Sequence, residues 1–169
     1  DSETINFVTV GRLSPEKDHE KLIKAFAKLS LLRNNIKLYI IGEGPLKNRL
    51  ISLTDRLGVK EKVIFTGHMS NPFQLVSKCN CFVLSSNYEG QALVLLETLI
   101  LEKPIIGTNV GGIRAVLEGG YGMLIENSEA ALLAAMEHFI MNGIATKTFD
   151  YVDYNKKALN MFYDEVCSL

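Results

Sequence analysis

The stretch INFVTVGRLSPEKDHEKLIKAFAKLSLL, residues 5–32, decides the fold. Its opening residues, 5–10, are rich in β-branched and aromatic side chains and are followed by a glycine, which is typical of a strand. Over residues 19–32 apolar residues recur at a spacing of three and four, which predicts a helix with one apolar face. A strand that leads through a loop into a helix is the repeating unit of a parallel sheet.

The same alternation continues along the chain. Further strands are predicted at residues 36–42, 62–67, 79–86, 103–108 and 121–125. A second amphipathic helix is predicted over 46–58, ending at Gly58, and the segment 149–169 is predicted to form a final helix that packs on the body or reaches toward a neighbouring domain. The sequence therefore predicts an α/β domain with a doubly wound, Rossmann-like parallel sheet of about six strands and helices on both faces.

Composition narrows the class of protein. The 169 residues are 47% hydrophobic, which suits one domain over 1–169 with a continuous core. The net charge of -1 excludes the strongly basic field that holds nucleic acid or an anionic membrane. A signal peptide and an apolar run of about 20 residues are both missing from the sequence, so we expect a cytoplasmic protein without a transmembrane segment. The abrupt start in a strand indicates a piece of a longer protein.

The three cysteines are expected to be free thiols. Cys79 and Cys81 fall in one predicted strand, too close together for an ordinary disulfide, and Cys167 leaves an odd count. No histidine or second cysteine pair lies near them in sequence to complete a zinc site. We expect a reducing compartment, with Cys81 in the core.

Glycines gather in the loops that follow the predicted strands. They are Gly11, Gly42, Gly44, Gly90, Gly111 and Gly112. Each one alone is explained by a tight turn, since glycine permits positive φ and close approach of the backbone. Their recurrence at one edge of the sheet favours a shared cleft, because ligands of doubly wound sheets bind beyond the carboxyl ends of the strands.

Two cations flank the turn after the first predicted strand. Arg12 provides a planar fork and Lys17 a mobile ammonium, a combination that suits a diphosphate. Two solvated loop cations explain this segment equally well. Asp18 is expected to cap the following helix.

The segment EGQALVLLE, residues 89–97, contains two carboxylates around an apolar helix. Residues 90–92 are expected to open that helix, where free N–H groups and the helix dipole favour an anion. Glu97 is expected on the apolar face, and a carboxylate taken from water costs several kcal/mol unless it is paired. Its partner is then a ribose diol or a nearby Lys or Arg, while Glu89 either binds a hexose or is only a loop acid.

Six segments together resemble a known family. They are VGRLSPEKDHEKLIKAF (10–26), LYIIGEGPLKNRL (38–50), VIFTGHM (63–69), SNYEGQALVLLE (86–97), KPIIGTNVGGI (103–113) and GYGMLI (120–125). In this order they are similar to the motifs of the C-terminal donor-binding domain of group 1 (family 4-like) glycosyltransferases, which are retaining enzymes of the GT-B fold with two Rossmann-like domains. The resemblance covers nearly the whole chain.

The resemblance implies roles for individual residues. Arg12 and Lys17 match the cations that hold the donor diphosphate and stabilise its charge as the glycosidic bond breaks. Glu89 matches the acid that contacts the donor hexose, so these three are the implied catalytic residues, and Glu97 matches the acid that binds the ribose. His68 either lines the base pocket or is a surface histidine. The other implied donor-binding residues are Gly11, Gly42, Gly44, Gly90, Gln91, Ala92 and Leu93.

The donor site is expected to work without a metal or other cofactor. The chain has no Asp-x-Asp, and Arg12, Lys17 and the helix start can replace a metal electrostatically. A UDP-hexose is expected as donor ahead of a GDP-hexose. Many relatives have Phe-Gly where this chain has Gln91 and Ala92, so the hexose pocket is expected to differ from theirs.

The implied function is that of the donor half of a retaining glycosyltransferase, which moves a hexose from a nucleoside diphosphate sugar to a hydroxyl of a glycan, lipid or wall polymer. The N-terminal acceptor domain is absent from these 169 residues, so the isolated domain is expected to be inactive. The full-length protein is expected in the cytoplasm or peripherally at the inner face of the membrane. The alternatives are a sugar-nucleotide epimerase or phosphorylase of related fold, and a non-enzymatic nucleotide-binding domain.

Overall fold

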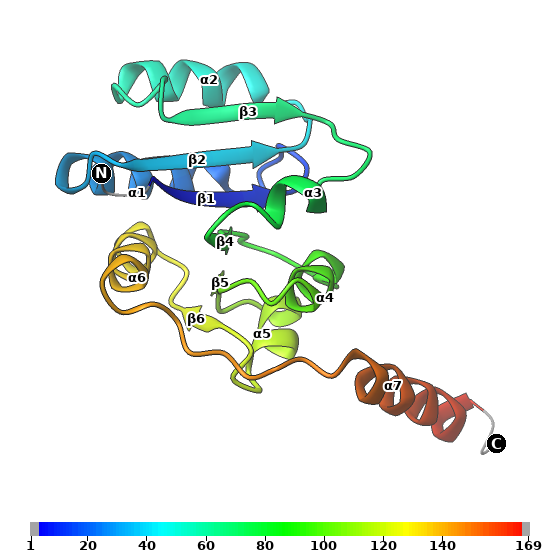
Figure 1. Cartoon of the computed structure of the whole chain (residues 1–169). Coiled ribbons are helices and arrows are strands. Elements are labelled where there is room, and N and C mark those ends of the chain that lie inside the picture. The colour runs from blue at the N-terminus through cyan, green and yellow to red at the C-terminus, as the bar shows by residue number, and fades with distance from the viewer. Residues whose placement is uncertain (1–3, 167–169) are drawn as a thin grey trace.

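The computed structural model describes residues 4–166, with side chains described as far as residue 160, and is built around one parallel sheet (Figure 1). Six strands lie in the order β3-β2-β1-β4-β5-β6, and each neighbouring pair is parallel. The strands are β1 (Ile5–Val10), β2 (Ile36–Ile41), β3 (Val63–Gly67), β4 (Cys81–Leu84), β5 (Ile105–Thr108) and β6 (Met123–Ile125). The predicted doubly wound, Rossmann-like α/β fold is confirmed.

Helices cover both faces of the sheet. They are α1 (His19–Leu32), α2 (Lys47–Arg56), α3 (Phe73–Val76), α4 (Leu93–Ile100), α5 (Gly111–Leu117), α6 (Glu129–Asn142) and α7 (Tyr151–Val166). Helix α1 packs against α2 and α6 on one face, and α4 packs against α3 and α5 on the other. Successive strand residues supply the two cores, with Phe7 and Ile40 on the α1 side and Val8 and Ile41 on the α4 side, as the period of two in a strand requires.

The order of the strands reverses between β1 and β4. From β1 the chain builds outward through β2 to β3, and from β4 it builds in the opposite direction through β5 to β6. The loops that follow β1 and β4 therefore lead to helices on opposite faces and leave a crevice between them. The residues expected to contact a ligand lie at this edge of the sheet or in α4, in the segments that follow β1, β2, β3 and β4.

Helices α1 and α2 agree with the sequence patterns, whereas β4 is shorter than predicted. Helix α1 covers the predicted residues, and α2 is followed by Gly58 in the left-handed region at φ 69°. Strand β4 begins at Cys81, and Cys79 lies in the turn that ends α3, where its N–H donates to the Val76 carbonyl. The prediction that Cys79 and Cys81 share a strand is wrong because that turn takes up the first of them.

Cys79 and Cys81 are free and buried, as expected. Burial raises the pKa of the Cys79 thiol to about 11, against the opposing charge of Lys103, and burial also raises the pKa of Cys81. Both therefore stay protonated at neutral pH. Cys167 lies outside the described residues.

Helix α7 extends away from the body of the domain (Figure 1). Aromatic rings connect it to the body. The ring of Phe149 packs edge-on against Tyr121 at a centroid distance of 5.6 Å, and it contacts the tilted ring of Tyr154 in the helix at 5.4 Å. Residues 151–160 are exposed to solvent. No helix within residues 4–166 has both the length and the apolar character needed to cross a membrane.

The first residue of α1, His19, is buried with 2% of its surface exposed. Its Nδ1 has no hydrogen-bond partner among the described residues. Burial lowers the pKa of His19 to about 4, and the charge of Lys17 adds to this effect. The imidazole is therefore neutral in the folded protein at pH values where it is largely protonated in the unfolded chain.

This difference predicts a loss of stability in mild acid. Between pH 7 and pH 5 the unfolded chain gains a proton at His19 that the folded protein does not accept, so the free energy of unfolding should fall by about 2 kcal/mol through this group. Urea unfolding of the wild type and of His19→Gln at both pH values measures the effect. The variant should lose most of the pH dependence, while His138→Gln, at an exposed histidine, should keep it. An unchanged dependence in His19→Gln would assign the effect to other groups.

Candidate functional site

Two of the residues expected to be catalytic meet across the crevice between β1 and β4. The Lys17 Nζ donates to Glu89 Oε2 in a direct ion pair, although the residues lie 72 positions apart in sequence. Their side chains are only 23% and 11% exposed, and the Ser86 hydroxyl donates to the same carboxylate oxygen at 3.4 Å. A half-buried ion pair with a further hydrogen bond on its carboxylate is thus placed at the edge where doubly wound sheets bind ligands.

Arg12 lies in the same loop as Lys17 but is exposed and forms no ion pair with a described residue. Glu89 compensates much of the charge of Lys17. Of the two loop cations, Arg12 is therefore the one more open to a further anion. The charges of Arg12 and Lys17 also help to lower the pKa of Glu16, after the larger effect of a hydrogen bond from Ser14. The loop between β1 and α1 thus carries two cations, Arg12 and Lys17, together with two carboxylates, Glu16 and Asp18.

An open cavity of about 360 Å³ lies beside Arg12, beyond the carboxyl ends of β1, β2 and β3. It is lined by Val10, Gly11, Arg12, Ile41, Gly42, Glu43, His68, Met69 and Pro72. The fold thus brings four of the expected donor-binding residues, from three separate loops, to one cavity. Gly44 does not line it.

Gly42 and Gly44 are required by the packing of two loops on each other. A Cβ on Gly42, which has φ 142°, would lie 2.0 Å from the Gly11 carbonyl oxygen, and one on Gly44 would lie 2.4 Å from the Leu13 carbonyl oxygen. Backbone hydrogen bonds join the same loops, from Gly11 N–H to the Ile41 carbonyl at 3.0 Å and from Leu13 N–H to the Glu43 carbonyl at 2.9 Å. Close backbone approach therefore accounts for both glycines without a ligand.

We expect Gly42→Ala to destabilise the domain by about 4 kcal/mol, because overlap with the Gly11 carbonyl adds to strain at positive φ. Gly58→Ala is the matched control: its φ is also positive, at 69°, but no atom lies within 4 Å of the added Cβ, so it should lose only about 1 to 2 kcal/mol. Denaturant unfolding measures both losses. Equal losses would contradict the tight contact between the two loops.

Helix α4 begins later than the sequence predicted. Its first residue is Leu93 with Ala92 at the N-cap, so Gly90 and Gln91 precede the helix instead of opening it. The backbone of Glu89 is held from the other side, where Gly112 N–H donates to its carbonyl at 2.8 Å. A Cβ on Gly112 would lie 2.6 Å from the carbonyl oxygens of both Glu89 and Gly90, so the start of α5 is packed directly on this loop.

Glu97 is exposed, and the expectation that it lies on the buried apolar face of the helix is wrong. Helix α4 buries Leu95, Thr98 and Leu99, whereas Leu93 is 61% exposed and Ile100 is 53% exposed. Apolar residues occur around most of this helix, so hydrophobicity alone did not identify the face that packs on the sheet. In the described structure Glu97 forms no ion pair with a Lys or Arg, which leaves its carboxylate open to solvent.

A polar cluster that the sequence did not predict lies next to this site. Asp18 caps α1 as expected, accepting from Lys21 N–H at 3.1 Å, but it does so in the left-handed region at φ 44°. Around it lie Lys21, Asn87 and Asn127, which contact one another through their side chains. Their sequence positions showed no local pattern from which the contact could be inferred.

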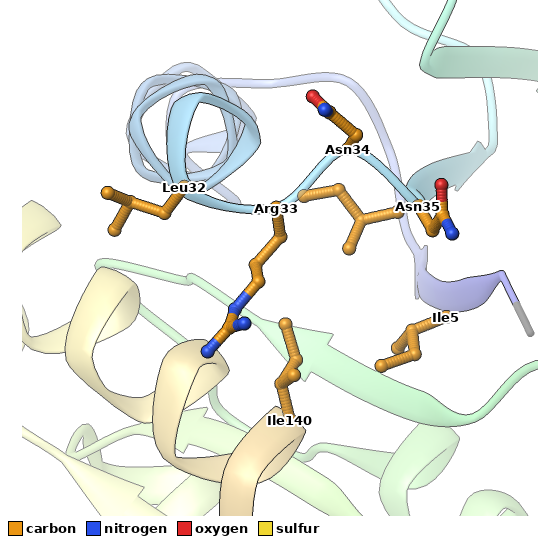
Figure 2. A pocket seen from close by; sticks show the side chains of 7 residues that line it. Ile5, Leu32, Arg33, Asn34, Asn35 and Ile140 are labelled. Carbon is orange, nitrogen blue, oxygen red and sulfur yellow. The ribbon is translucent and has the colours of Figure 1, made fainter. Parts of the chain in front are cut away.

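A further cavity, of about 460 Å³, lies at the opposite end of the sheet beside the amino ends of β1 and β2 (Figure 2). Arg33 extends across it toward Ile140 of α6. None of the expected site residues lines this cavity. Among the side chains described, those of residues 4–160, no group of three His, Cys, Asp or Glu is arranged to hold a metal ion.

Comparison with known proteins identifies the family. The model of the family described as glycosyl transferases group 1 matches residues 1–157. Among curated relatives, the chain is 36% identical to an N-acetylgalactosaminyltransferase of Campylobacter jejuni that acts on an undecaprenol-linked diphosphate, over 70% of this chain and 32% of that protein. It is 29% identical to the capsular polysaccharide biosynthesis glycosyltransferase CapM of Staphylococcus aureus, over 95% of this chain and 43% of that protein. The chain belongs to the group 1 glycosyl transferases.

Solved structures support the fold. The lipopolysaccharide outer core galactosyltransferase WaaB aligns with a TM-score of 0.82 and 23% identity, over 98% of this chain and 50% of that one. Anabaena HepE in complex with UDP and glucose aligns with a TM-score of 0.81 and 22% identity, over 96% of this chain and 49% of that one. The chain thus spans about half of these structures, and less than half of the two curated relatives described above.

Proposed function

We propose that this chain is the donor-binding part of a retaining glycosyltransferase, which transfers a hexose from a UDP sugar to a hydroxyl of a glycan, lipid or wall polymer. The contact of Lys17 with Glu89 at the crevice is the observation on which the proposal rests. The contact brings together an ammonium, which is suited to bind phosphate, and a carboxylate, which is suited to bind sugar hydroxyls, in a chain of the group 1 family. Arg12 and the cavity beside it provide room for the rest of the nucleotide.

In this proposal the Lys17 ammonium serves two partners. An ammonium has three donors, and one of them is directed at Glu89, so the others remain for oxygens of the donor diphosphate. When the bond between the anomeric carbon and the diphosphate breaks, the diphosphate keeps the electron pair and gains negative charge. Lys17 and Arg12 stabilise that charge, while the Glu89 carboxylate accepts hydrogen bonds from the hexose and orients it.

The remaining donor contacts belong to the same proposal. Glu97 accepts hydrogen bonds from the ribose, and its exposure leaves both carboxylate oxygens available for this role. The cavity beside Gly42 and His68 takes the base. UDP is preferred over GDP as a candidate because two similar structures, those of HepE and of a pneumococcal O-GlcNAc transferase, are complexes with UDP. The proposed chemistry uses no metal.

The acceptor side is proposed to come from a second domain of a longer protein. The chain covers 32% of its Campylobacter relative and 43% of CapM, so those proteins have room for such a domain. The name of the Campylobacter relative includes an undecaprenol-linked diphosphate, so a lipid-linked glycan is the proposed acceptor class. We place the full-length protein in the cytoplasm or at the inner face of the membrane, and we expect the isolated domain to bind donor without turning it over.

Calorimetric titration of the domain with UDP, GDP and UDP hexoses, each in the presence of EDTA, tests the proposal. Arg12→Ala and Glu97→Ala should each weaken UDP binding by about 1.5 to 3 kcal/mol, since each removes a hydrogen bond to a charged group. Arg56→Ala, which changes an exposed arginine in the last turn of α2, should bind like the wild type. If neither the domain nor the full-length protein binds a nucleotide at millimolar concentration, the proposed function is wrong.

A further inference from the structure

The Lys21 ammonium joins three separate loops beside the site. Its side chain is only 11% exposed, and its Nζ contacts Asp18 Oδ2 at 3.2 Å, Asn87 Oδ1 at 2.8 Å and Asn127 Oδ1. These oxygens belong to the loops that follow β1, β4 and β6. Three acceptors meet the three donors of one ammonium, so the hydrogen-bonding capacity of this charge is satisfied by protein atoms.

Asn87 connects this cluster to both neighbouring loops. Its side-chain N–H group donates to Asp18 Oδ2 at 3.0 Å, and its Oδ1 accepts from Asn127 Nδ2 at 3.1 Å as well as from Lys21. Its backbone N–H donates to the Glu16 carbonyl at 2.7 Å. The side chain and the backbone of Asn87 therefore both bind the segment of residues 16–18, which contains Lys17.

The cluster lies next to the ion pair in sequence as well as in space. Asn87 is two residues before Glu89, and Asp18 directly follows Lys17. Asp18 has φ 44°, a conformation that costs a non-glycine residue free energy and persists only where surrounding contacts hold it. The contacts to Lys21 and Asn87 are such contacts, and a shift in either would move the backbone that presents Lys17 or Glu89.

We propose that Lys21 is a positioning residue for the transfer reaction: it does not contact the donor, and it sets Glu89 against Lys17 through Asn87 and Asp18. The inference rests on the proposed function of the same crevice. Small displacements of groups that orient a substrate lower catalytic rates strongly, so the effect should be larger on binding and turnover of the sugar donor than on binding of UDP alone.

The test uses the full-length protein with three variants. Lys21→Met keeps the length of the side chain and removes the charge, Lys21→Arg keeps the charge, and Lys24→Met is a matched control on the same helix, where the ammonium pairs with Glu20 at the surface. The ligands are UDP and a panel of UDP-glucose, UDP-galactose and UDP-N-acetylglucosamine. Affinity is measured by calorimetry, and kcat and KM are measured by UDP release.

For Lys21→Met we expect affinity for the UDP sugar and kcat to fall about tenfold or more, while affinity for UDP changes by less than about threefold. Lys21→Arg should recover most of the loss, and Lys24→Met should match the wild type. If the wild type binds no UDP sugar, the proposed function fails. If it binds one and Lys21→Met binds and turns it over equally well, the positioning role is overturned.

A double-mutant cycle separates positioning from stability. Because Lys21 is inferred to act through Glu89, Lys21→Met should change the affinity for the sugar donor by less than about threefold in a Glu89→Gln background. Equal losses in both backgrounds would overturn the inference. If Lys21→Met does not fold, Asn127→Ala replaces it in the cycle, since it removes one acceptor and keeps the ion pair of Lys21 with Asp18.

Discussion

The reversal of strand order between β1 and β4 is the constraint on which the rest of the structure depends. Since the sheet grows in opposite directions from these neighbours, the loops after them diverge, and a crevice forms where the carboxyl ends of the central strands meet. Lys17 and Glu89 approach each other there from opposite walls, and the start of α5 supports the Glu89 backbone through Gly112. The contact between Lys17 and Glu89 thus follows from the strand order together with the packing of helices on both faces of the sheet.

Lys17 and Lys21 both reach the loop that follows β4, but they have different partners there. Lys17 contacts the carboxylate of Glu89. Lys21 contacts the side-chain amide oxygen of Asn87, which lies two residues before Glu89 in the sequence. A carboxylate partner can be exchanged for, or shared with, an incoming anion, whereas an ammonium held by three oxygens of the protein has no donor to spare. The same residue type thus forms an ion pair with one carboxylate at position 17 and joins three loops at position 21.

Much of the fold followed from the sequence because its signals are local. The spacing of apolar residues and the capping Asp18 predicted α1 with its observed bounds, and the alternation of strands with helices predicted a doubly wound parallel sheet, although not the order of its strands. The buried face of α4 did not follow from the sequence, since apolar residues occur around most of that helix and only its contacts with the sheet decide which of them are buried. The cluster of Lys21 with Asn87 and Asn127 joins residues 66 and 106 positions apart, a separation at which periodicity conveys no information.

The attachment of α7 has a consequence for how the molecule moves. The described side chains of this helix, residues 151–160, are exposed, and the rings of Tyr121, Phe149 and Tyr154 form an aromatic contact between the helix and the body. A segment held in this way opens by itself at a small cost in free energy, long before the sheet separates. Amide hydrogens of α7 will therefore exchange with solvent through local opening, on a faster timescale than those of β1 and β4, and the helix can reorient while the crevice keeps its shape.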